Sequence, residues 1–381
     1  MTDRPRALVV SFSDITADAR VLRQVAVVAR HAHVTTIAYG AQPAGSDEHL
    51  RLPDGAKSLP QTLPGVAKLA TRRLRSAEMG APGSQAALRL AAGRSFDVVV
   101  ANDPRAMPVS FALADGAPVW ADLHEWSPEE RSHVPVWKLL VAPFMDHLCR
   151  TYLPRTAAST TVAGSIAELY EREYSVRPEV MRNAAPWADL SPTPVDGDTI
   201  RLVHSGGAVP GRELEAMIDA VQALGDDYSL DLYLVPANDG GKYLAQLKNR
   251  AAGHGLITFH DPVAPTALPA TLNFYDIGAF WIKPFNTNAR YTLPNKLFDF
   301  IQARLAIAVG PTVEMQRVVE DHGLGVVSTD FTLDSIVESV RAMTREDIAG
   351  FKQAAHAASQ GLSFEADAAV ADAILERLLR A

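Results

Sequence analysis

Two kinds of segment alternate along this chain, and the alternation runs twice. Short apolar runs rich in Val and Ile predict buried strands, and longer stretches with apolar residues at helical spacing predict amphipathic helices. Strands that alternate with helices form parallel sheets covered on both faces. The predicted strands are residues 7–12, 34–39, 97–101, 118–122 and 157–162 in the first half, and 200–204, 230–235, 256–259, 276–282, 305–309 and 324–327 in the second.

Helices are predicted between and after these strands. Ser165, followed three residues later by Glu168, predicts a capping box at the start of a short helix. The other predicted helices are residues 18–30, 212–224, 242–252, 295–304 and 314–320, and a helical tail whose last member covers 364–379.

The two halves meet in residues 182–199, which contain prolines and lack an apolar period. Such a stretch is typical of a linker between domains. A chain of 381 residues is also too long for one ordinary hydrophobic core. We therefore predict an N-terminal domain over residues 1–185 and a C-terminal domain that begins at residue 186.

Composition excludes several classes of protein. With 48% apolar and 21% charged residues the chain is globular, and 36 basic against 44 acidic residues give a net charge of −8, which argues against a nucleic-acid binder. The lone Cys149 cannot form an intramolecular disulfide or a thiolate zinc cluster. The apolar run 7–12 is too short for a signal sequence, and no run is long enough to span a membrane. We expect a cytoplasmic protein.

Ligands of doubly wound sheets bind beyond the carboxyl ends of the strands, so the loops after predicted strands are the candidate sites. One loop, residues 204–212 (HSGGAVPGR), places Gly206 and Gly207 before Arg212. Glycines let a phosphate approach the backbone, a following helix offers free N–H groups, and arginine binds phosphate bidentately. The spacing matches neither the Walker loop nor the GxGxxG fingerprint. The loop is either a phosphate site or a plain strand-to-helix turn.

A second loop leads into the helix predicted over residues 295–304. Pro294 and Asn295 mark the helix start, with Asn295 as the expected cap, so Lys296 lies in the first turn, where the helix dipole favours anions. Asp299, one turn later, shares that face and could take two ribose hydroxyls. The alternative is that Lys296 and Asp299 form a surface ion pair, which would stabilise the helix by only about 0.3 kcal/mol.

Two polar loops follow strands of the first half. His124, flanked by Asp122 and Glu125, ends a predicted strand and is a catalytic candidate. Pro128 excludes a His-Glu-x-x-His zinc helix. The second polar group comprises Ser13, Asp14, Arg20, Asn102 and Asp103.

Taken together, four segments resemble the family 4-type glycosyltransferases of the GT-B fold. They are VVSFSDITADARVLRQV, WADLHEWSPEE, LVHSGGAVPGRELEAMIDAV and LPNKLFDFIQARLAIAVG, and the likeness extends from residue 7 to the end of the chain. The resemblance implies two Rossmann-like parallel-sheet domains, 1–185 and 186–362, that face a central cleft, and a C-terminal helix, 363–381, that crosses back to the first domain. It also implies transfer of a sugar from a nucleotide-diphosphate donor to an acceptor, with retention and with no tightly bound cofactor or metal.

The resemblance assigns roles to individual residues. Asp299 matches the position that holds the nucleotide ribose, where the family has Glu, and Tyr291 occupies the position of a second family Glu. The expected catalytic residues are His124, Arg212 and Lys296. The expected donor-binding residues are Gly206, Gly207, Arg212, Lys283, Tyr291, Asn295, Lys296 and Asp299. The expected acceptor-side residues are Ser13, Asp14, Arg20, Asp103 and Glu125.

Three alternatives stay open. The first is a sugar-nucleotide 2-epimerase, which shares the two-domain architecture. The second is an inactive GT-B scaffold, which the departures at Tyr291 and Asp299 would suit. The third concerns the basic stretch 68–75 (KLATRRLR), from Lys68 to Arg75, which is either a solvated helix face or a peripheral contact with an anionic membrane surface.

Overall fold

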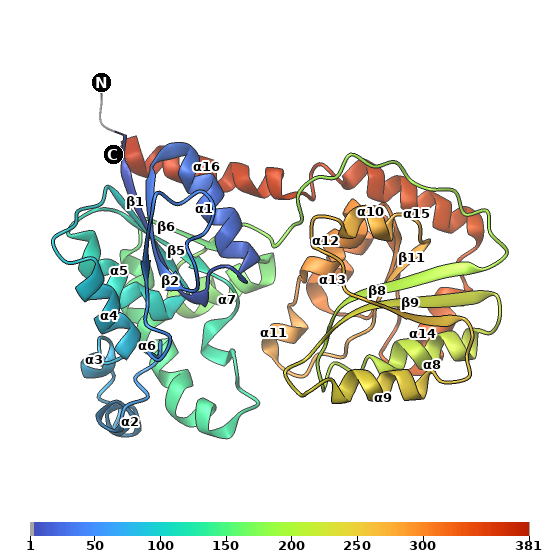
Figure 1. The fold of residues 1–381 in the computed structure, drawn as a ribbon, viewed down its shortest axis with the longest axis horizontal. Helices are drawn as coiled ribbons and strands as arrows, with labels where there is room; N and C mark the ends of the chain where they lie inside the picture. The colour runs from blue at the N-terminus through green and yellow to red at the C-terminus, as the bar shows by residue number, and fades with distance from the viewer. Residues whose placement is uncertain (1–3, 381) are drawn as a thin grey trace. The chain divides into compact units, whose positions relative to one another are not determined.

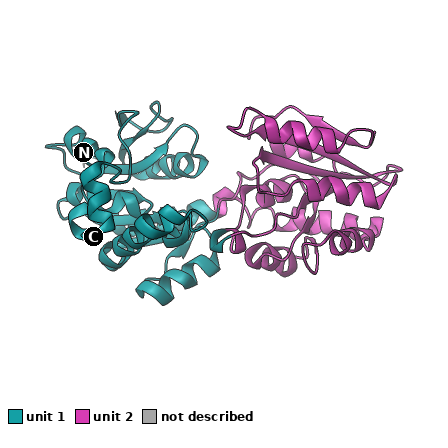
Figure 2. Cartoon of the chain, turned by 90° about the horizontal axis from the view of Figure 1, so that it is seen from below, with its two compact units in different colours: residues 1–182, 286–288, 367–381 teal, residues 183–285, 289–366 magenta. Residues whose placement is uncertain are grey.

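The computed structural model describes residues 4–380, and the chain divides into two compact units (Figures 1 and 2). Unit 1 contains the residues up to 182, residues 286–288 and the residues from 367 onward, and unit 2 contains residues 183–285 and 289–366. Within unit 1, the side chain of Asn288 accepts a hydrogen bond from the backbone N of Trp126 (2.8 Å) and donates one to its carbonyl (3.1 Å).

The sheet of unit 1 is parallel throughout, in the order β3-β2-β1-β4-β5-β6-β7. Its central strands are buried on both faces, as expected for a sheet between helices. The sequence did not predict β3 and β7, because both are short edge strands with polar residues. The strands are β1 (Arg6–Asp14), β2 (His33–Tyr39), β3 (Glu48–Arg51), β4 (Val98–Asn102), β5 (Val119–Leu123), β6 (Ala158–Thr161) and β7 (Glu179–Val180).

Helices cover both faces of this sheet (Figure 1). Helix α1 follows Asp18, whose carboxylate accepts the N–H of Val21 at 3.2 Å and caps the helix. The predicted capping box is wrong, because α7 begins at Gly164 and Ser165 already lies inside it. The helices of this half are α1 (Ala19–His31), α2 (Leu63–Ala70), α3 (Leu74–Ala77), α4 (Pro82–Leu90), α5 (Met107–Ala114), α6 (Ala142–Tyr152) and α7 (Gly164–Tyr174).

The last helix, α16 (Phe364–Arg380), belongs to unit 1 from residue 367 onward and runs beside α1 (Figure 1). Asp372 of α16 contacts Arg30 (3.0 Å) and His31 (2.7 Å) in the last turn of α1. Arg182, at the end of the first stretch of unit 1, pairs with Asp367 at 2.9 Å. The contacts of Asp372 attach α16 to the first helix, and that of Asp367 attaches it to residue 182.

The sheet of unit 2 is also parallel, in the order β10-β9-β8-β11-β12-β13. Every strand predicted for either half overlaps an observed one, so the predicted α/β class is confirmed. The strands are β8 (Ile200–Ala208), β9 (Tyr228–Pro236), β10 (Ile257–His260), β11 (Ile277–Phe280), β12 (Ala306–Val309) and β13 (Gly325–Val327). The helices are α8 (Glu215–Leu224), α9 (Lys242–Arg250), α10 (Leu268–Leu272), α12 (Asn295–Gln302), α13 (Val313–Asp321), α14 (Leu333–Arg341) and α15 (Arg345–Ala358). Helix α11 (Thr287–Arg290) begins in residues that belong to unit 1 and ends in unit 2.

Strand order reverses once in each sheet. In unit 1 the chain returns from β3 to place β4 on the other side of β1, and in unit 2 it returns from β10 to place β11 on the other side of β8. Loops at such a reversal diverge and leave a crevice beyond the carboxyl ends of the strands. The fold therefore favours ligand sites after β1 and β4 in unit 1, and after β8 and β11 in unit 2. None of the helices in residues 4–380 has the length and apolar character needed to cross a bilayer.

Candidate functional sites

The glycine loop of unit 2 is the end of a strand. Strand β8 continues to Ala208, and Gly206 and Gly207 pair with β9 opposite Leu234 and Val235. The sequence predicted that a helix opens at Arg212, and this is wrong, because α8 begins only at Glu215. Positive φ angles at Gly211 (84°) and Glu213 (51°) keep the intervening loop out of the helical conformation.

Two cations lie against the same stretch of backbone at the end of β8. Gly206 has φ +141°, and a Cβ atom there would collide with Cε and Nζ of Lys296, which lies over it. A Cβ atom on Gly207 would lie 3.9 Å from Nη1 of Arg212. The position of Lys296 therefore requires the absence of a side chain at Gly206, whereas Arg212 lies at an ordinary contact distance from Gly207, and the two cations meet at one strand end.

Helix α12 carries Lys296 to this position. The residue before the helix is Pro294, and no side chain caps the first turn. Asn295, predicted as the cap, is the exposed first residue of the helix, so that prediction is wrong. The helix packs closely on β11 because Gly278 leaves room for the ring of Phe300. The first turn of α12, with its unbonded N–H groups, thus begins next to the glycine loop.

Lys296 and Arg212 are cations without counter-ions. Burial and the nearby Arg212 lower the pKa of Lys296 to about 8, against an opposing contribution from Asp299. Burial also lowers the pKa of Arg212. Within residues 4–380, neither side chain makes a hydrogen bond or an ion pair; Lys296 Nζ lies 5.9 Å from the ring centroid of Phe280. An anion bound here would relieve both desolvation and mutual repulsion.

Two buried polar groups lie at the base of the same loop. His204 donates a hydrogen bond from Nδ1 to the carbonyl of Ala279 (2.8 Å), and its Nε2 has no partner among the described residues. Burial, together with Lys296 and Arg212, lowers the pKa of His204 to about 3, so its ring is neutral. The hydroxyl of Ser205 is likewise buried without a hydrogen-bond partner in the described chain. The sequence placed both residues in the loop but assigned them no role.

The other predicted donor residues are distributed around this group. Asp299 is half-buried one turn after Lys296 and influences its pKa. Lys283 is exposed in the segment after β11. Tyr291 is half-buried, and Cζ of Arg290 lies over its ring, 5.7 Å from the ring centroid. No hydrogen bond or ion pair among residues 4–380 joins the side chains of Lys283, Tyr291 or Asn295 to the two cations.

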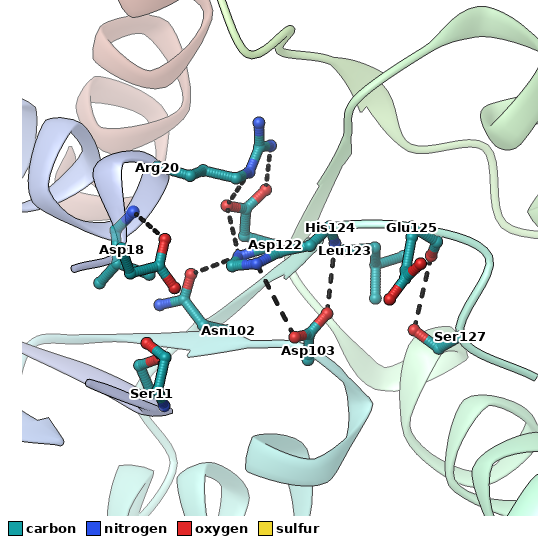
Figure 3. A network of polar contacts seen from close by, with 12 residues as sticks. Ser11, Asp18, Arg20, Asn102, Asp103, Asp122, Leu123, His124, Glu125 and Ser127 are labelled. Atoms are coloured by element: carbon teal, nitrogen blue, oxygen red, sulfur yellow. Dashed lines mark hydrogen bonds and ion pairs between the residues drawn. The ribbon is translucent and has the colours of Figure 1, made fainter. Parts of the chain in front are cut away.

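In unit 1, His124 follows β5 and lies within a network of acceptors (Figure 3). Its Nε2 lies 3.0 Å from Oδ1 of Asn102 and 3.5 Å from Oδ2 of Asp122, and its Nδ1 lies 3.8 Å from Oδ2 of Asp103. Burial by itself would lower the pKa of His124, but Asp103 and Asp122 outweigh it and raise the pKa to about 9. At neutral pH His124 is therefore an imidazolium with 20% of its side chain exposed.

The buried pair of Arg20 and Asp122 supports this histidine. Arg20 Nε and Nη2 donate to the two carboxylate oxygens of Asp122 at 2.8 and 2.6 Å, and Thr160 Oγ1 donates to it at 2.7 Å. Burial would raise the pKa of Asp122, but Arg20 and His124 hold it well below its usual range. Arg20 was predicted to face an acceptor; the structure instead gives it 7% exposure and uses its guanidinium inside the unit, where it positions Asp122 beneath His124.

A group of carboxylates surrounds the exposed side of His124. Asp103 has a positive φ of 66° and accepts the backbone N–H of His124 at 3.3 Å. Burial and the carboxylates of Glu130 and Asp103 raise the pKa of Glu125 to about 8. Arg105 lies 3.7 Å from both Asp103 and Glu130, which raise its pKa against the effect of burial. The sequence did not single out Arg105, which only the fold brings to this loop, and it gave no role to Glu130, the last residue of the segment WADLHEWSPEE.

The carboxyl end of β1 forms a group of its own. Ser13 Oγ lies 2.8 Å from Ser11 Oγ, and Asp14 accepts from the backbone N (3.1 Å) and hydroxyl (2.7 Å) of Thr16. In the described chain, no hydrogen bond or ion pair joins Ser13 or Asp14 to His124. The structure thus brings Arg20, Asp103 and Glu125 to the surroundings of His124 and leaves Ser13 and Asp14 in a separate group at the end of β1.

No protein-family model matches this sequence, and none of the curated proteins does. Solved structures resemble the whole chain. The sucrose-phosphate synthase of Thermosynechococcus elongatus superposes with a TM-score of 0.74 at 13% identity, covering 99% of this chain and 100% of that one. HepE of Anabaena, in complex with UDP and glucose, gives 0.67 at 14% identity, with 99% of each chain covered. WaaG, a glycosyltransferase of lipopolysaccharide biosynthesis, gives 0.65 at 13% identity over 97% of this chain and 99% of that one.

These likenesses define the class of fold. The chain is a protein of two Rossmann-like parallel-sheet units, of seven and six strands. More particularly, it has the GT-B fold that its sequence predicted, since neighbours of that fold cover it almost completely.

Proposed function

We propose that the chain is a glycosyltransferase that uses a nucleotide-diphosphate sugar as donor, with the diphosphate bound by Arg212 and Lys296 over Gly206 and Gly207. The observation that carries the proposal is the pair of half-buried cations without counter-ions at the end of β8, in a GT-B fold. The neighbours named above support it, because one was solved with UDP and glucose and another is a glycosyltransferase. Asp299 would hold the ribose.

The chemistry follows from the charges. When the bond between the anomeric carbon and the diphosphate oxygen breaks, its electron pair moves to the diphosphate, whose growing negative charge Arg212 and Lys296 stabilise. The acceptor oxygen forms the new bond to the anomeric carbon, and its proton passes to a leaving phosphate oxygen. This route needs no separate base and gives retention, which is part of the proposal.

Unit 1 would contribute His124 to the same reaction. Because its pKa is raised to about 9, His124 acts at neutral pH as a charged hydrogen-bond donor toward the donor sugar. Glu125, with a pKa of about 8, is largely protonated at that pH and could donate to an acceptor hydroxyl. Epimerisation of a sugar nucleotide needs a group ready to remove a proton, so these two protonation states favour transfer over the 2-epimerase.

Calorimetric titration with UDP, GDP, ADP and dTDP tests the donor site. At least one should bind, and Arg212→Ala should weaken its affinity by roughly tenfold to a hundredfold, the value of one charge-assisted contact. Arg89→Ala, at an exposed arginine of α4, is the matched control and should bind like the wild type. Absence of binding by all four nucleotides, or equal binding by both variants, would refute the proposal.

Product analysis separates transfer from its alternatives. With the nucleotide sugar that binds, transfer yields free nucleoside diphosphate and a glycoside whose anomeric configuration reports retention. Epimerised sugar nucleotide formed without any acceptor would establish the 2-epimerase instead. Binding without turnover by any acceptor would favour the inactive scaffold, to which Tyr291 and Asp299 point. The cytoplasmic location remains a prediction of the sequence.

A further inference from the structure

Two segments of unit 1 contain no acidic residue at all. Residues 55–77 and 131–145 together carry seven Lys and Arg side chains and no Asp or Glu, although the whole chain has a net charge of −8. The first segment includes α2 and α3, and the second includes the π-helical turn Trp137–Val141. In the sequence only the stretch Lys68–Arg75 stands out, because the second segment is distant in the chain.

The fold joins these two segments into one surface. Helix α2 packs against the π-helical turn, and the guanidinium of Arg72 donates a hydrogen bond to the carbonyl of Leu139 at 2.9 Å. Trp137 is buried beneath this junction, with 8% exposure. We call the surface formed by residues 63–76 and 134–139 the basic apolar face.

Large aliphatic side chains project from this face into solvent. Leu63 is 90% exposed, Val136 66% and Leu139 63%, and among the described residues only Phe274 of unit 2 is another large apolar side chain above 60%. Val66 and Val134, both 39% exposed, lie in the same two segments. Such a cluster in an otherwise ordinary surface marks an interaction site.

Cations accompany these apolar side chains. Arg73, Arg75 and Lys138 are exposed, and none of them forms an ion pair within residues 4–380. Arg72, Arg73 and Arg75 line a depression of about 440 Å³ with His147. The nearest carboxylate in sequence, Glu78, is occupied by His147 (2.6 Å) and Tyr152 (2.7 Å). The positive charge of the face is therefore not neutralised by its own surroundings.

We propose that the basic apolar face docks on an anionic lipid bilayer. Leu63, Val136 and Leu139 insert among the acyl chains near the interface, and Arg73, Arg75 and Lys138 contact the phosphate groups of the lipids. Charge complementarity and exposed aliphatic side chains in one place are what a peripheral membrane contact requires. A soluble phosphate could contact the cations, but it would not bury the exposed aliphatic side chains. The proposal is independent of the proposed function, since none of these residues belongs to the donor site or the His124 site.

Co-sedimentation of the full chain with vesicles tests the proposal. Vesicles of phosphatidylcholine alone are compared with vesicles of phosphatidylcholine and phosphatidylglycerol. The charge variant is R73Q/R75Q/K138Q, and the apolar variant is L63S/V136S/L139S. The matched controls change exposed cations, R89Q/K242Q/K248Q, and exposed apolar residues, L256S/F274S/L333S, elsewhere on the molecule.

The wild type and both controls should sediment with the anionic vesicles only. The charge variant should lose roughly a hundredfold in partition coefficient, from three cations near the surface. The apolar variant should lose about tenfold. All variants should melt like the wild type and bind nucleoside diphosphate equally, so failure at the membrane is distinguishable from failure at the donor site.

Several outcomes would overturn the proposal. Equal sedimentation with both kinds of vesicle, or with neither, would exclude an anionic bilayer as the partner. Retention of binding by either the charge or the apolar variant would show that the face is not the contact. Loss of vesicle binding in an excess of soluble glycerophosphate at constant ionic strength would show that the arginines bind a free phosphate ester instead.

Discussion

The carboxyl edges of the two sheets carry opposite electrostatics. In unit 1, the cations Arg20, Arg105 and His124 are surrounded by carboxylates, and Asp103 and Asp122 raise the pKa of His124 to about 9. In unit 2, Arg212 and Lys296 lack counter-ions, and burial lowers the pKa of Lys296 to about 8. The cations at the carboxyl edge of the sheet are therefore neutralised by carboxylates in unit 1 and are left without neutralising carboxylates in unit 2.

This difference distinguishes a site whose side chains are held in place by one another from a site that is suited to bind an anion. A cation held by buried carboxylates keeps its geometry and protonation state without a ligand, as His124 does. Two neighbouring cations without counter-ions repel each other, so binding of an anion would stabilise unit 2. Removing a charge from the His124 network should therefore destabilise the protein, whereas removing a cation from unit 2 should weaken anion binding without destabilising it.

The largest expected difference concerns stability. Asp122→Asn leaves the buried guanidinium of Arg20 without its counter-ion and should lower the free energy of unfolding by about 3–5 kcal/mol. Lys296→Met removes an uncompensated cation and should leave that free energy unchanged or raise it by about 1–3 kcal/mol. Urea unfolding followed by circular dichroism measures both. Similar decreases in the free energy of unfolding of the two variants would contradict the difference between the units.

The next prediction tests whether the close approach of Lys296 to Gly206 matters for nucleotide binding. Gly206→Ala introduces a Cβ that collides with Lys296, and Gly211→Ala introduces one in open space, also at a positive φ (84°, against 141° at Gly206). Both carry backbone strain, but only Gly206→Ala should cost a charge-assisted contact, weakening nucleotide affinity about tenfold to a hundredfold more. Calorimetry on both variants decides. If they bind equally well, Lys296 is not part of the donor site.

Asp299 and His124 should separate binding from turnover. Asp299→Ala should weaken nucleoside diphosphate affinity by about thirtyfold through lost ribose hydrogen bonds to a charged group. His124→Ala should change that affinity less than threefold and act mainly on kcat. Titration calorimetry and steady-state kinetics provide the two measurements. Equal effects of both variants on affinity would contradict the assigned roles.

The smallest effect concerns pH. Lys296 would have to be charged to bind a diphosphate, and its pKa in the free protein is about 8, so affinity should be nearly full below about pH 7 and decline as the pH rises through 8. Between pH 7 and pH 9 the decline should reach about tenfold. Lys296→Arg keeps its charge and should bind almost independently of pH over this range. A decline of the same size in that variant would assign the titration to another group.

The sequence predicted the architecture well because the signals for it are local. Apolar runs and helical periods gave the strands, and the carboxyl ends of those strands gave the loops that hold Gly206, His124 and Arg212. It failed where neighbours decide. Asn295 has the side chain of a helix cap, but Pro294 takes that position, and Arg20, predicted to face an acceptor, forms a buried pair with Asp122.

What the sequence determined by itself is the rhythm of strands and helices, the two parallel sheets and the list of groups able to bind phosphate, because burial and turn chemistry act over a few residues. What only the tertiary structure decided is the charge of each group. Arg20 and Asp122 meet across 102 residues, and Lys296 meets Gly206 from another segment. A pKa depends on burial and on charges a few ångströms away, and those distances exist only in the folded chain.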